Sequence, residues 1–312
     1  MTKLDEKEII NILADKLGIT DLDDVALLDK NIVFKTDMLV ASTDVPPGME
    51  AWQVARKSIV SCVSDLAAKG VMPHAAMISL GLPRSCTRPY VEGLARGFAG
   101  ASKEFRVKIA GGDTNEAYGL VIDCSMIGFA TGSKLPTRKG ARPGDVIVVS
   151  GMFGLPPAGL AILMRNATAT GTFRKQASES VHVPAPRQRF GLTLARYFSS
   201  SIDSSDGLAV SLYELAGQSK VDIEVDNIPI ADGLEKFARE NGLDSHELVF
   251  HGGEEYEIIA TIPKAKLDQA EVAARKAGLH LHIIGRVRTG AGNVFVRKKL
   301  LENKGYAHFR VR

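Results

Sequence analysis

The spacing of apolar and polar positions predicts a mixture of helices and strands in the first half of the chain. Ile9, Ile10, Leu13 and Leu17 recur at helical spacing near the amino terminus, which predicts a packed amphipathic helix there. Glycine and proline at the borders of the later apolar runs set the limits of those elements. The predicted helices cover 6–17, 50–69 and 89–104, and the predicted strands lie near 31–41, 74–82, 107–110 and 119–130.

The second half follows a segment rich in Gly, Pro and basic residues, 132–144, which is the predicted linker. A continuous apolar strand is predicted over 145–150. The polar stretch 165–181, rich in Ala, Thr and Ser, is predicted to be an exposed loop or the end of the preceding helix. Residues 202–207 are predicted to form an acidic turn. The remaining predicted helices cover 158–164, 186–198, 208–218, 231–241 and 264–277, and the remaining strands lie near 221–226, 255–262, 280–288 and 293–298.

The length of 312 residues exceeds the size at which a single hydrophobic core stops growing, so two domains are expected. Their predicted ranges are 1–137 and 138–312. Helices and strands alternate in both halves, but the long strands near 74–82 and 119–130 favour antiparallel pairing over a simple doubly wound parallel sheet. The predicted fold class is therefore α+β.

The amino-acid composition and net charge indicate which class of protein this is. A hydrophobic fraction of 45% and a charged fraction of 24% are typical of an ordinary soluble globular protein. A net charge of +3 is too small to indicate a nucleic-acid partner, and three widely separated cysteines fit reduced thiols in a cytosolic setting. The amino terminus lacks the pattern of a secretory signal, and no apolar run approaches the ~20 residues that span a bilayer. We expect a cytoplasmic protein with neither a nucleic-acid nor a membrane partner.

Acidic residues recur where apolar runs meet loops or helix starts. Taken singly, any one of them is usually a cap or turn residue. That interpretation is preferred for Asp23 when it is considered by itself. Folding could nevertheless gather several of them, and crowded carboxylates must be protonated or neutralised by cations. Oxygen ligands without accompanying Cys or His pairs suit Mg²⁺ bound together with substrate phosphates. The acidic segments contain Asp23 with Asp24, Asp37, Asp65, Asp113, and Asp203 with Asp206.

The common phosphate-binding motifs are absent from the sequence. It contains no G-x-x-x-x-G-K-[ST], no G-x-G-x-x-G after a strand, and no protein-kinase motif set. Gly111–Asn115 predicts a turn that brings backbone close to a ligand, although a tight hairpin explains it equally well. Ser204–Gly207 precedes a helix and suits an anion or an N-cap. Gly252–Tyr256 combines glycines with acids, as a ligand loop or a surface hairpin does.

Together these motifs resemble those of thiamine-monophosphate kinases, which share a superfamily with aminoimidazole ribonucleotide synthetase. The resemblance runs from Asp23 to Phe309 and implies a two-domain fold, with an N-terminal ATP-, metal-binding and dimerisation domain that forms a dimeric β-barrel and a C-terminal α/β domain. It implies a homodimer that uses ATP and several Mg²⁺ ions to phosphorylate thiamine monophosphate. The matching segments are KTDMLV, SDLAAKGVMP, IAGGDTN, LPTRKGARPGD, SSDGL, HGGEEYE and KGYAHF.

The resemblance also implies roles for individual residues. Where many members carry a substrate-contacting His, this chain has Asp44, an acid suited to a cationic thiazolium ring. Glu254 and Tyr306 resemble the other substrate contacts. The implied catalytic residues are Asp37, Asp113 and Arg138. The implied ATP contacts are Gly112, Asp113, Arg138 and Ser205. The implied metal ligands are Asp24, Thr36, Asp37, Asp65, Asp113, Asp203 and Asp206.

The acceptor of this reaction needs no catalytic base. A phosphate monoester has a second pKa near ~6 and is already largely ionised at neutral pH. The protein would then supply positioning and charge neutralisation. Two alternatives remain open: a related ATP-dependent synthetase of the same superfamily, and a nucleotide-binding regulator without catalysis.

Overall fold

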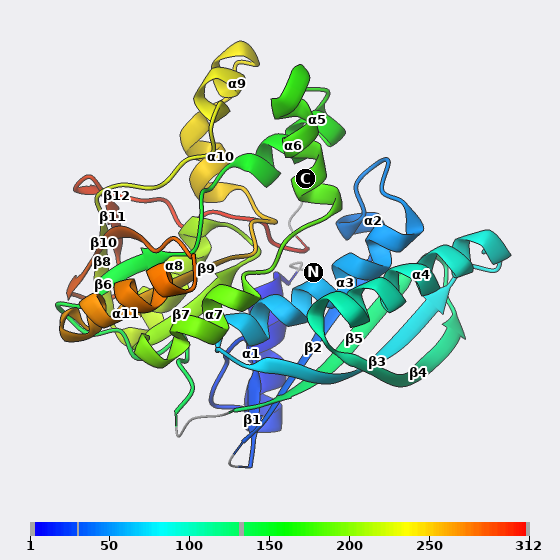
Figure 1. The fold of residues 1–312 in the computed structure, drawn as a ribbon, viewed down its shortest axis with the longest axis horizontal. Helices are drawn as coiled ribbons and strands as arrows, with labels where there is room; N and C mark the ends of the chain where they lie inside the picture. The colour runs from blue at the N-terminus through cyan, green and yellow to red at the C-terminus, as the bar shows by residue number, and fades with distance from the viewer. Residues whose placement is uncertain (1–3, 30, 131–133, 310–312) are drawn as a thin grey trace.

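Each half of the chain forms its own sheet in the computed structural model, which describes residues 4–29, 31–130 and 134–309 (Figure 1). The first sheet has the order β1-β2-β5-β3-β4, with β3 parallel to β4 and the other neighbours antiparallel. It is open, with β1 and β4 at its edges, so the described residues contain no closed barrel. Its strands are β1 (Ala26–Leu28), β2 (Ile32–Val40), β3 (Met72–Leu82), β4 (Lys108–Glu116) and β5 (Val121–Phe129).

Helices cover one face of this sheet. α3 and α4 pack against each other, and α3 also contacts β2 and β5. Alternate residues of β5, such as Ile122 and Met126, are fully buried on the helix-covered face, as strand periodicity requires. The helices of this half are α1 (Glu6–Leu17), α2 (Ala41–Asp44), α3 (Ala51–Ala68) and α4 (Arg88–Phe105).

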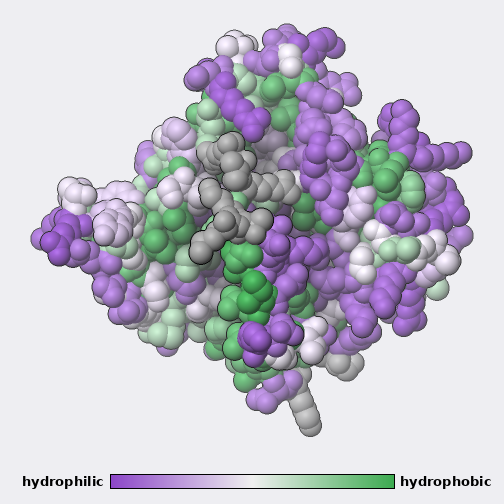
Figure 2. All heavy atoms as spheres, turned by 180° about the vertical axis from the view of Figure 1, so that it is seen from behind, coloured by the Kyte–Doolittle hydropathy of each residue, from purple (hydrophilic) through white to green (hydrophobic). Residues whose placement is uncertain are grey.

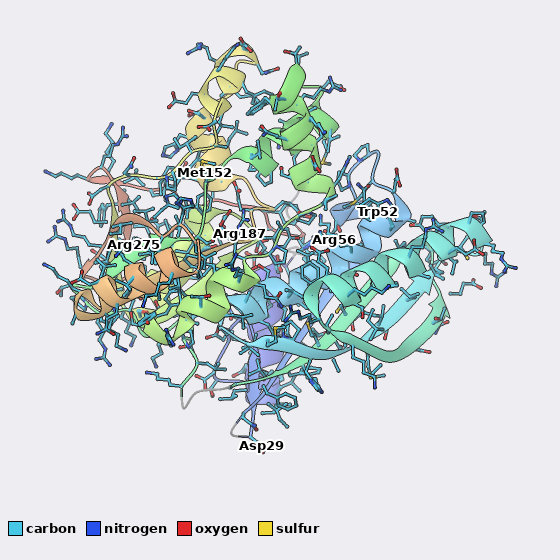
Figure 3. The ribbon with its side chains drawn as sticks, in the orientation of Figure 1. Asp29, Trp52, Arg56, Met152, Arg187 and Arg275 are labelled. Atoms are coloured by element: carbon cyan, nitrogen blue, oxygen red, sulfur yellow. The ribbon has the colours of Figure 1, made fainter. Side chains whose placement is uncertain are left out.

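α3 is buried on nearly every side because it lies between the two halves of the molecule. Even its polar residues are enclosed, and they reach partners on other elements. Arg56 donates to both carboxylate oxygens of Glu104 at 2.8 and 2.7 Å, and to the Pro184 carbonyl at 2.7 Å. In Figure 3, Arg56 and Arg187 lie in the central part of the molecule, whereas Asp29 lies at its margin. The helix therefore joins the halves through polar contacts as well as apolar packing.

The second sheet has the order β12-β11-β8-β10-β6-β9-β7 and is mainly antiparallel, with β8 and β11 parallel. Its core includes Ile147, Ile223 and Ile259, all fully buried. Its strands are β6 (Val146–Val149), β7 (Ser200–Ser204), β8 (Val221–Val225), β9 (Glu257–Ile262), β10 (His282–Thr289), β11 (Val294–Val296) and β12 (Lys299–Leu300).

The helices of the second half pack around this sheet (Figure 1). α8 contacts β7 and β8, and α5 pairs with α6. They are α5 (Leu155–Arg165), α6 (Gly171–His182), α7 (Gln188–Leu194), followed by a 3₁₀ turn at Ala195–Tyr197, α8 (Leu208–Ser219), α9 (Leu234–Glu240), α10 (Ser245–His251) and α11 (Lys264–Lys276).

Three sequence predictions are wrong. The stretch 165–181 is a loop only over 166–170, because α6 begins at Gly171 and buries Ala177 and Val181. The acidic turn expected at 202–207 begins inside β7, whose five residues are all buried. The short strand expected at 107–110 extends through Glu116, since backbone pairing with β3 continues to that residue. In each case tertiary packing or strand pairing outweighs local residue preference.

The predicted linker 132–144 lies partly outside the described residues. From Lys134 to Gly144 the backbone contains neither helix nor strand. Figure 2 shows the opposite face of the molecule, where an apolar strip runs between hydrophilic areas. α1 lies on this side and exposes Leu13 and Leu17. Among the described residues, no helix has the length and apolar character needed to cross a bilayer.

Candidate active site

Three aspartates from distant parts of the chain meet in one buried cluster. Asp24 precedes β1, Asp65 lies on α3, and Asp203 lies on β7. One carboxylate oxygen of each lies within 4.8 Å of the others, and all three residues are buried. We call this set the aspartate cluster. Folding thus brings together three of the acids that the sequence proposed as metal ligands.

Burial and mutual repulsion shift the acid strength of two cluster members. Burial raises the pKa of Asp65 well above its ordinary value; Lys35 opposes this shift, but Asp203, Asp24 and Asp37 reinforce it. Burial and Asp24 also raise the pKa of Asp203, although Ser64 donates a hydrogen bond to Asp203 Oδ2 at 2.8 Å. Both carboxylates therefore favour the protonated form unless a cation binds beside them.

Asp24 is the exception, because two cationic side chains bind it directly. Lys69 Nζ lies 2.7 Å from Asp24 Oδ2 and 2.6 Å from Asp23 Oδ1. Arg138 Nε donates to Asp24 Oδ1 at 2.7 Å. Burial opposes ionisation, but Lys69 and Arg138 outweigh it and hold the pKa of Asp24 below its usual value. The Arg138 backbone N–H also donates to Asp23 at 2.8 Å, so Asp23 has the structural role preferred for it.

A second lysine binds Asp65 of the cluster and the neighbouring Asp37. Lys35 Nζ lies 2.7 Å from Asp65 Oδ2 and 3.3 Å from Asp37 Oδ2. Burial disfavours the charged lysine, but Asp65 and Asp37 raise the pKa of Lys35 well above its ordinary value. Sequence reasoning missed Lys35 and Lys69. Two signals pointed to them: Lys35 lies two residues before Asp37 on a strand, and Lys69 lies four residues after Asp65, directly after the end of the buried helix α3.

The structure does not bring Thr36 or Asp113 into the aspartate cluster. Successive strand residues face opposite sides of a sheet, so Thr36 points away from Asp37 and hydrogen-bonds Asp123 at 2.8 Å. Asp113 lies opposite Ser79, which in turn lies opposite Asp123. Thr36, Asp113 and Asp123 therefore share the sheet face that α3 does not cover, which we call the open face.

Gly112 has a structural reason to be glycine. It lies within β4 and not in the expected turn, and a Cβ atom there would lie 1.7 Å from the Ile78 carbonyl oxygen. The close backbone approach expected at this glycine is therefore an approach to β3. The GGD pattern indicated a turn because glycine disfavours strands, but pairing with β3 fixes the extended conformation.

The segment after β7 lies at the junction with the carboxyl-terminal segment. Ser205 is exposed, and its carbonyl accepts a hydrogen bond from the Glu254 N–H at 2.6 Å. Asp206 reaches the surface, yet its pKa is raised to about 7. The first cause is partial desolvation by the surrounding protein, and repulsion from the carboxylates of Glu6 and Asp203 adds to it. Its carbonyl accepts from the Tyr306 N–H at 2.9 Å. Ser205 and Asp206 thus lie beside the segments that carry two predicted substrate contacts.

The predicted substrate residues Asp44 and Glu254 are linked by Lys57. Lys57 Nζ donates to the Asp44 carbonyl at 2.8 Å and to Glu254 Oε1 at 2.7 Å. The Asp44 carboxylate accepts from the Val40 N–H at 2.6 Å, so part of its role is local. Glu254 adopts a left-handed backbone conformation, φ 70°, in a loop fixed by Ser205. Tyr306 is 39% exposed, and its hydroxyl lies 3.4 Å from His308 Nδ1.

The donor set of the aspartate cluster fits Mg²⁺. Its ligands are carboxylate oxygens, without Cys or His, which is the chemistry this hard cation prefers. Lys35, Lys69 and Arg138 are three cations beside five carboxylates, those of Asp23, Asp24, Asp37, Asp65 and Asp203, so they neutralise only part of the negative charge when all five are ionised. The arrangement can therefore accept divalent cations and, with Arg138, bring phosphate groups close to the buried acids.

Comparisons with known proteins agree with this geometry. The family profile described as AIR synthase related protein, N-terminal domain, matches residues 22–130, and the profile of its C-terminal domain matches 142–298. The chain is 43% identical to the thiamine-monophosphate kinase of Nitrosopumilus maritimus over 316 residues, which covers 99% of this chain and 100% of that protein. It is 34% identical to the thiamine-monophosphate kinase of Pyrococcus horikoshii, covering 99% and 98%.

The same similarity extends to a solved structure. AaThiL complexed with AMPPCP and TMP superposes on this chain with a TM-score of 0.89 and 28% sequence identity, covering 99% of each chain. That protein was therefore solved with a nucleotide analogue and TMP on a fold that matches the present one along nearly its full length.

Proposed function

The chain belongs to the AIR synthase related family, among the thiamine-monophosphate kinases, and on this premise we propose that it transfers the terminal phosphoryl group of ATP in line to thiamine monophosphate. The products would be thiamine diphosphate and ADP. The observation that carries the proposal is the convergence of Asp24, Asp65 and Asp203, from three separate segments, within 4.8 Å in a buried place.

Magnesium would be held by the aspartate cluster, with Asp37 beside it and Asp206 near its border. Bound Mg²⁺ would neutralise the phosphate oxygens of donor and acceptor, which otherwise repel each other. Burial supports this role, because charge interactions are stronger where water is excluded. The raised pKa of Asp65 supports it as well, since a cation would restore its ionised form.

The basic side chains around the cluster would have two different roles, holding the metal ligands in place and binding phosphate. Lys69 is almost fully enclosed, bound to Asp23, Asp24 and the Ser201 carbonyl, so it would hold the ligands in place. Arg138 is partly exposed, and Asp24 binds its Nε and Nη2 groups. Its Nη1 group lies 3.9 Å from Glu214 Oε2, too far for a hydrogen bond, so Nη1 would still be able to donate to an ATP phosphate. Gly112 and Ser205 are the other proposed ATP contacts.

At the acceptor, the protein would need to bind and position thiamine monophosphate rather than activate it. The phosphate of thiamine monophosphate is already ionised near neutral pH, so no protein base has to remove a proton. The thiazolium ring is cationic, and Asp44 and Glu254, joined by Lys57, offer carboxylates that would attract it. Tyr306 would add an aromatic surface beside the ring. Positioning by these groups would supply much of the rate enhancement.

The open face supports a homodimer. Large apolar side chains on it remain exposed, among them Met38 at 59% and Met77 at 56%. Covering this face with a second copy would bury them and would complete a barrel from two open sheets. Asp113 and Thr36 would then lie at the interface and could serve the site of the other chain. The proposed domains remain 1–137 and 138–312, with the boundary in the irregular segment after Lys134.

Incubation with ATP, Mg²⁺ and thiamine monophosphate, followed by phosphorus NMR, tests the proposal. We expect the resonances of ADP and of a second diphosphate ester to grow together. Release of inorganic phosphate in place of the ester would instead indicate a synthetase of the same superfamily. ATP binding without turnover would indicate a regulator.

A further inference from the structure

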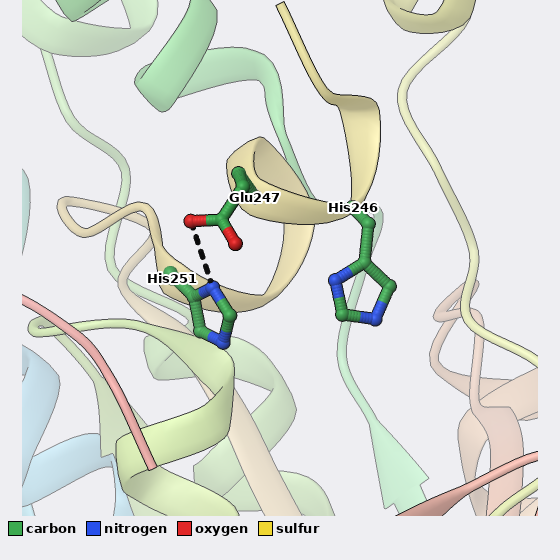
Figure 4. A group of neighbouring side chains, drawn as sticks. All are labelled: His246, Glu247 and His251. Atoms are coloured by element: carbon green, nitrogen blue, oxygen red, sulfur yellow. Dashed lines mark ion pairs between the residues drawn. The ribbon is translucent and has the colours of Figure 1, made fainter. Parts of the chain in front are cut away.

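α10 presents a second group of possible metal ligands in the C-terminal half. His246, Glu247 and His251 each offer a ligand atom within 4.8 Å of the others (Figure 4). His246 and Glu247 are exposed, whereas the His251 side chain is only 8% exposed. Two imidazoles and one carboxylate form a donor set unlike the all-oxygen aspartate cluster. This group therefore differs in chemistry from the proposed magnesium site.

Both ring nitrogens of His251 lie beside oxygen acceptors. His251 Nε2 lies 3.2 Å from the Glu302 carbonyl oxygen, which can only accept a hydrogen bond. His251 Nδ1 is buried and lies 3.1 Å from Glu247 Oε2, shown by the dashed line in Figure 4. A neutral imidazole has one N–H and one lone pair, so one of its nitrogens would face an acceptor without a hydrogen between them. Either a second proton or a metal ion resolves this conflict.

The position of His246 distinguishes between the two cations. A proton on His251 needs only Glu247 and Glu302 as partners, and both are in place. His246 adds a third ligand atom to the same group, and its ring packs at a tilt against Phe250, with ring centroids 4.5 Å apart. Donation of a ring N–H to a backbone carbonyl is also the usual way in which a metal-bound histidine is oriented.

We propose that His246, Glu247 and His251 bind a borderline divalent cation of the Zn²⁺ class. Imidazole nitrogen is the ligand such ions prefer, and Mg²⁺ and Ca²⁺ disfavour it. Three protein ligands leave a fourth tetrahedral position open to water, which agrees with the exposure of His246 and Glu247.

The bound ion would brace two segments that border the active site. His251 ends α10 and leads directly into Gly252, Gly253 and Glu254. Its Nε2 group contacts Glu302, on the segment that continues to Tyr306 and crosses Asp206. Fixing the His251 ring would therefore hold the start of the Glu254 loop against the carboxyl-terminal segment.

Cobalt provides the direct test, because tetrahedral Co²⁺ absorbs visible light and substitutes for Zn²⁺. The full-length protein is titrated with Co²⁺ in saturating Mg²⁺, which keeps the aspartate cluster filled. We expect one equivalent per chain to give a tetrahedral spectrum that Zn²⁺ displaces. H246A and E247Q alter exposed side chains and should fold normally, yet each should weaken Co²⁺ binding at least about 10-fold, because even outer partners of a metal site cost 10–100-fold.

The matched control is H280A, which removes a histidine of the other close pair, His280 and His282, with ring centroids 6.1 Å apart. This variant should bind Co²⁺ like the unaltered protein. Loss of binding in H280A with retention in H246A would move the site to that pair and overturn the proposal. A wild-type protein that gives no tetrahedral spectrum, with His251 doubly protonated by nitrogen NMR in the presence of Zn²⁺, would also overturn it.

Discussion

Replacing Lys69 with methionine removes a buried cation while keeping nearly the same side-chain volume. Lys69 is 2% exposed and binds Asp23 at 2.6 Å, Asp24 at 2.7 Å and the Ser201 carbonyl at 2.7 Å. Removing one partner of a buried ion pair leaves an uncompensated charge, which costs about 3–5 kcal/mol. Arg138 still binds Asp24 in the variant, so we expect a loss near the lower end, about 3 kcal/mol.

Urea denaturation in magnesium-free buffer measures this loss. The control is Lys236→Met, because Lys236 forms an exposed pair with Glu240 and should change stability by less than about 1 kcal/mol. Magnesium adds a second readout. The carboxylates released from Lys69 should bind the ion more tightly, so Mg²⁺ should stabilise Lys69→Met more than the unaltered protein. A loss no larger than that of the control, or no added response to Mg²⁺, would refute the assignment of Lys69 as a built-in counter-ion.

Three further predictions address the site and its surroundings. Asp37→Asn should remove most kinase activity while leaving the fold intact, because it removes a charge beside the cluster; near-normal turnover at limiting Mg²⁺ would contradict this. Asp65→Asn and Asp113→Asn should each be inactive alone, but co-expressed they should recover about a quarter of wild-type activity, because half of randomly paired dimers then contain one intact site; recovery would not occur if Asp113 served its own chain. Burial raises the pKa of Glu255 well above its ordinary value, so its ionisation destabilises the fold: stability is full below the unfolded pKa and falls as pH rises toward the folded pKa. Glu255→Gln should therefore gain stability relative to the wild type between pH 5 and pH 8 in denaturation experiments, and a constant difference would count against this.

The sequence predicts most elements of the first sheet because their apolar patterns are strong and their ends carry glycine or proline. α1 matches its prediction at both ends, since the Asp5–Glu8 capping box and Gly18 define it locally. β7 was missed because its SSIDS sequence looks like a polar turn, and only pairing with β9 explains its burial. Local residue preference alone cannot reveal such pairing.

The candidate site, like the fold, could be predicted from the sequence only in part. The family motifs proposed a set of acids as metal ligands; Asp24, Asp65 and Asp203 of that set lie together, whereas Asp113 lies on the open face. Neither indicated that Lys35 and Lys69 would supply internal counter-charge, because an isolated lysine in a sequence is most often a solvated surface residue. Strand alternation could have separated Thr36 from Asp37. The position of Asp113 depended on whether Gly111 and Gly112 form a turn or a strand, which pairing with β3 decides.

The central claim is that the aspartate cluster, with divalent ions, forms the place where a polyphosphate binds. The most direct measurement is the melting temperature of the wild type and of Asp65→Asn with Mg²⁺ and a nonhydrolysable ATP analogue. At about 100 times its dissociation constant a ligand stabilises the native state by about 2.7 kcal/mol, so the wild type should melt several degrees higher and Asp65→Asn should not respond. An unchanged wild-type melting curve at saturating ligand, or an equal rise in the variant, would contradict the claim.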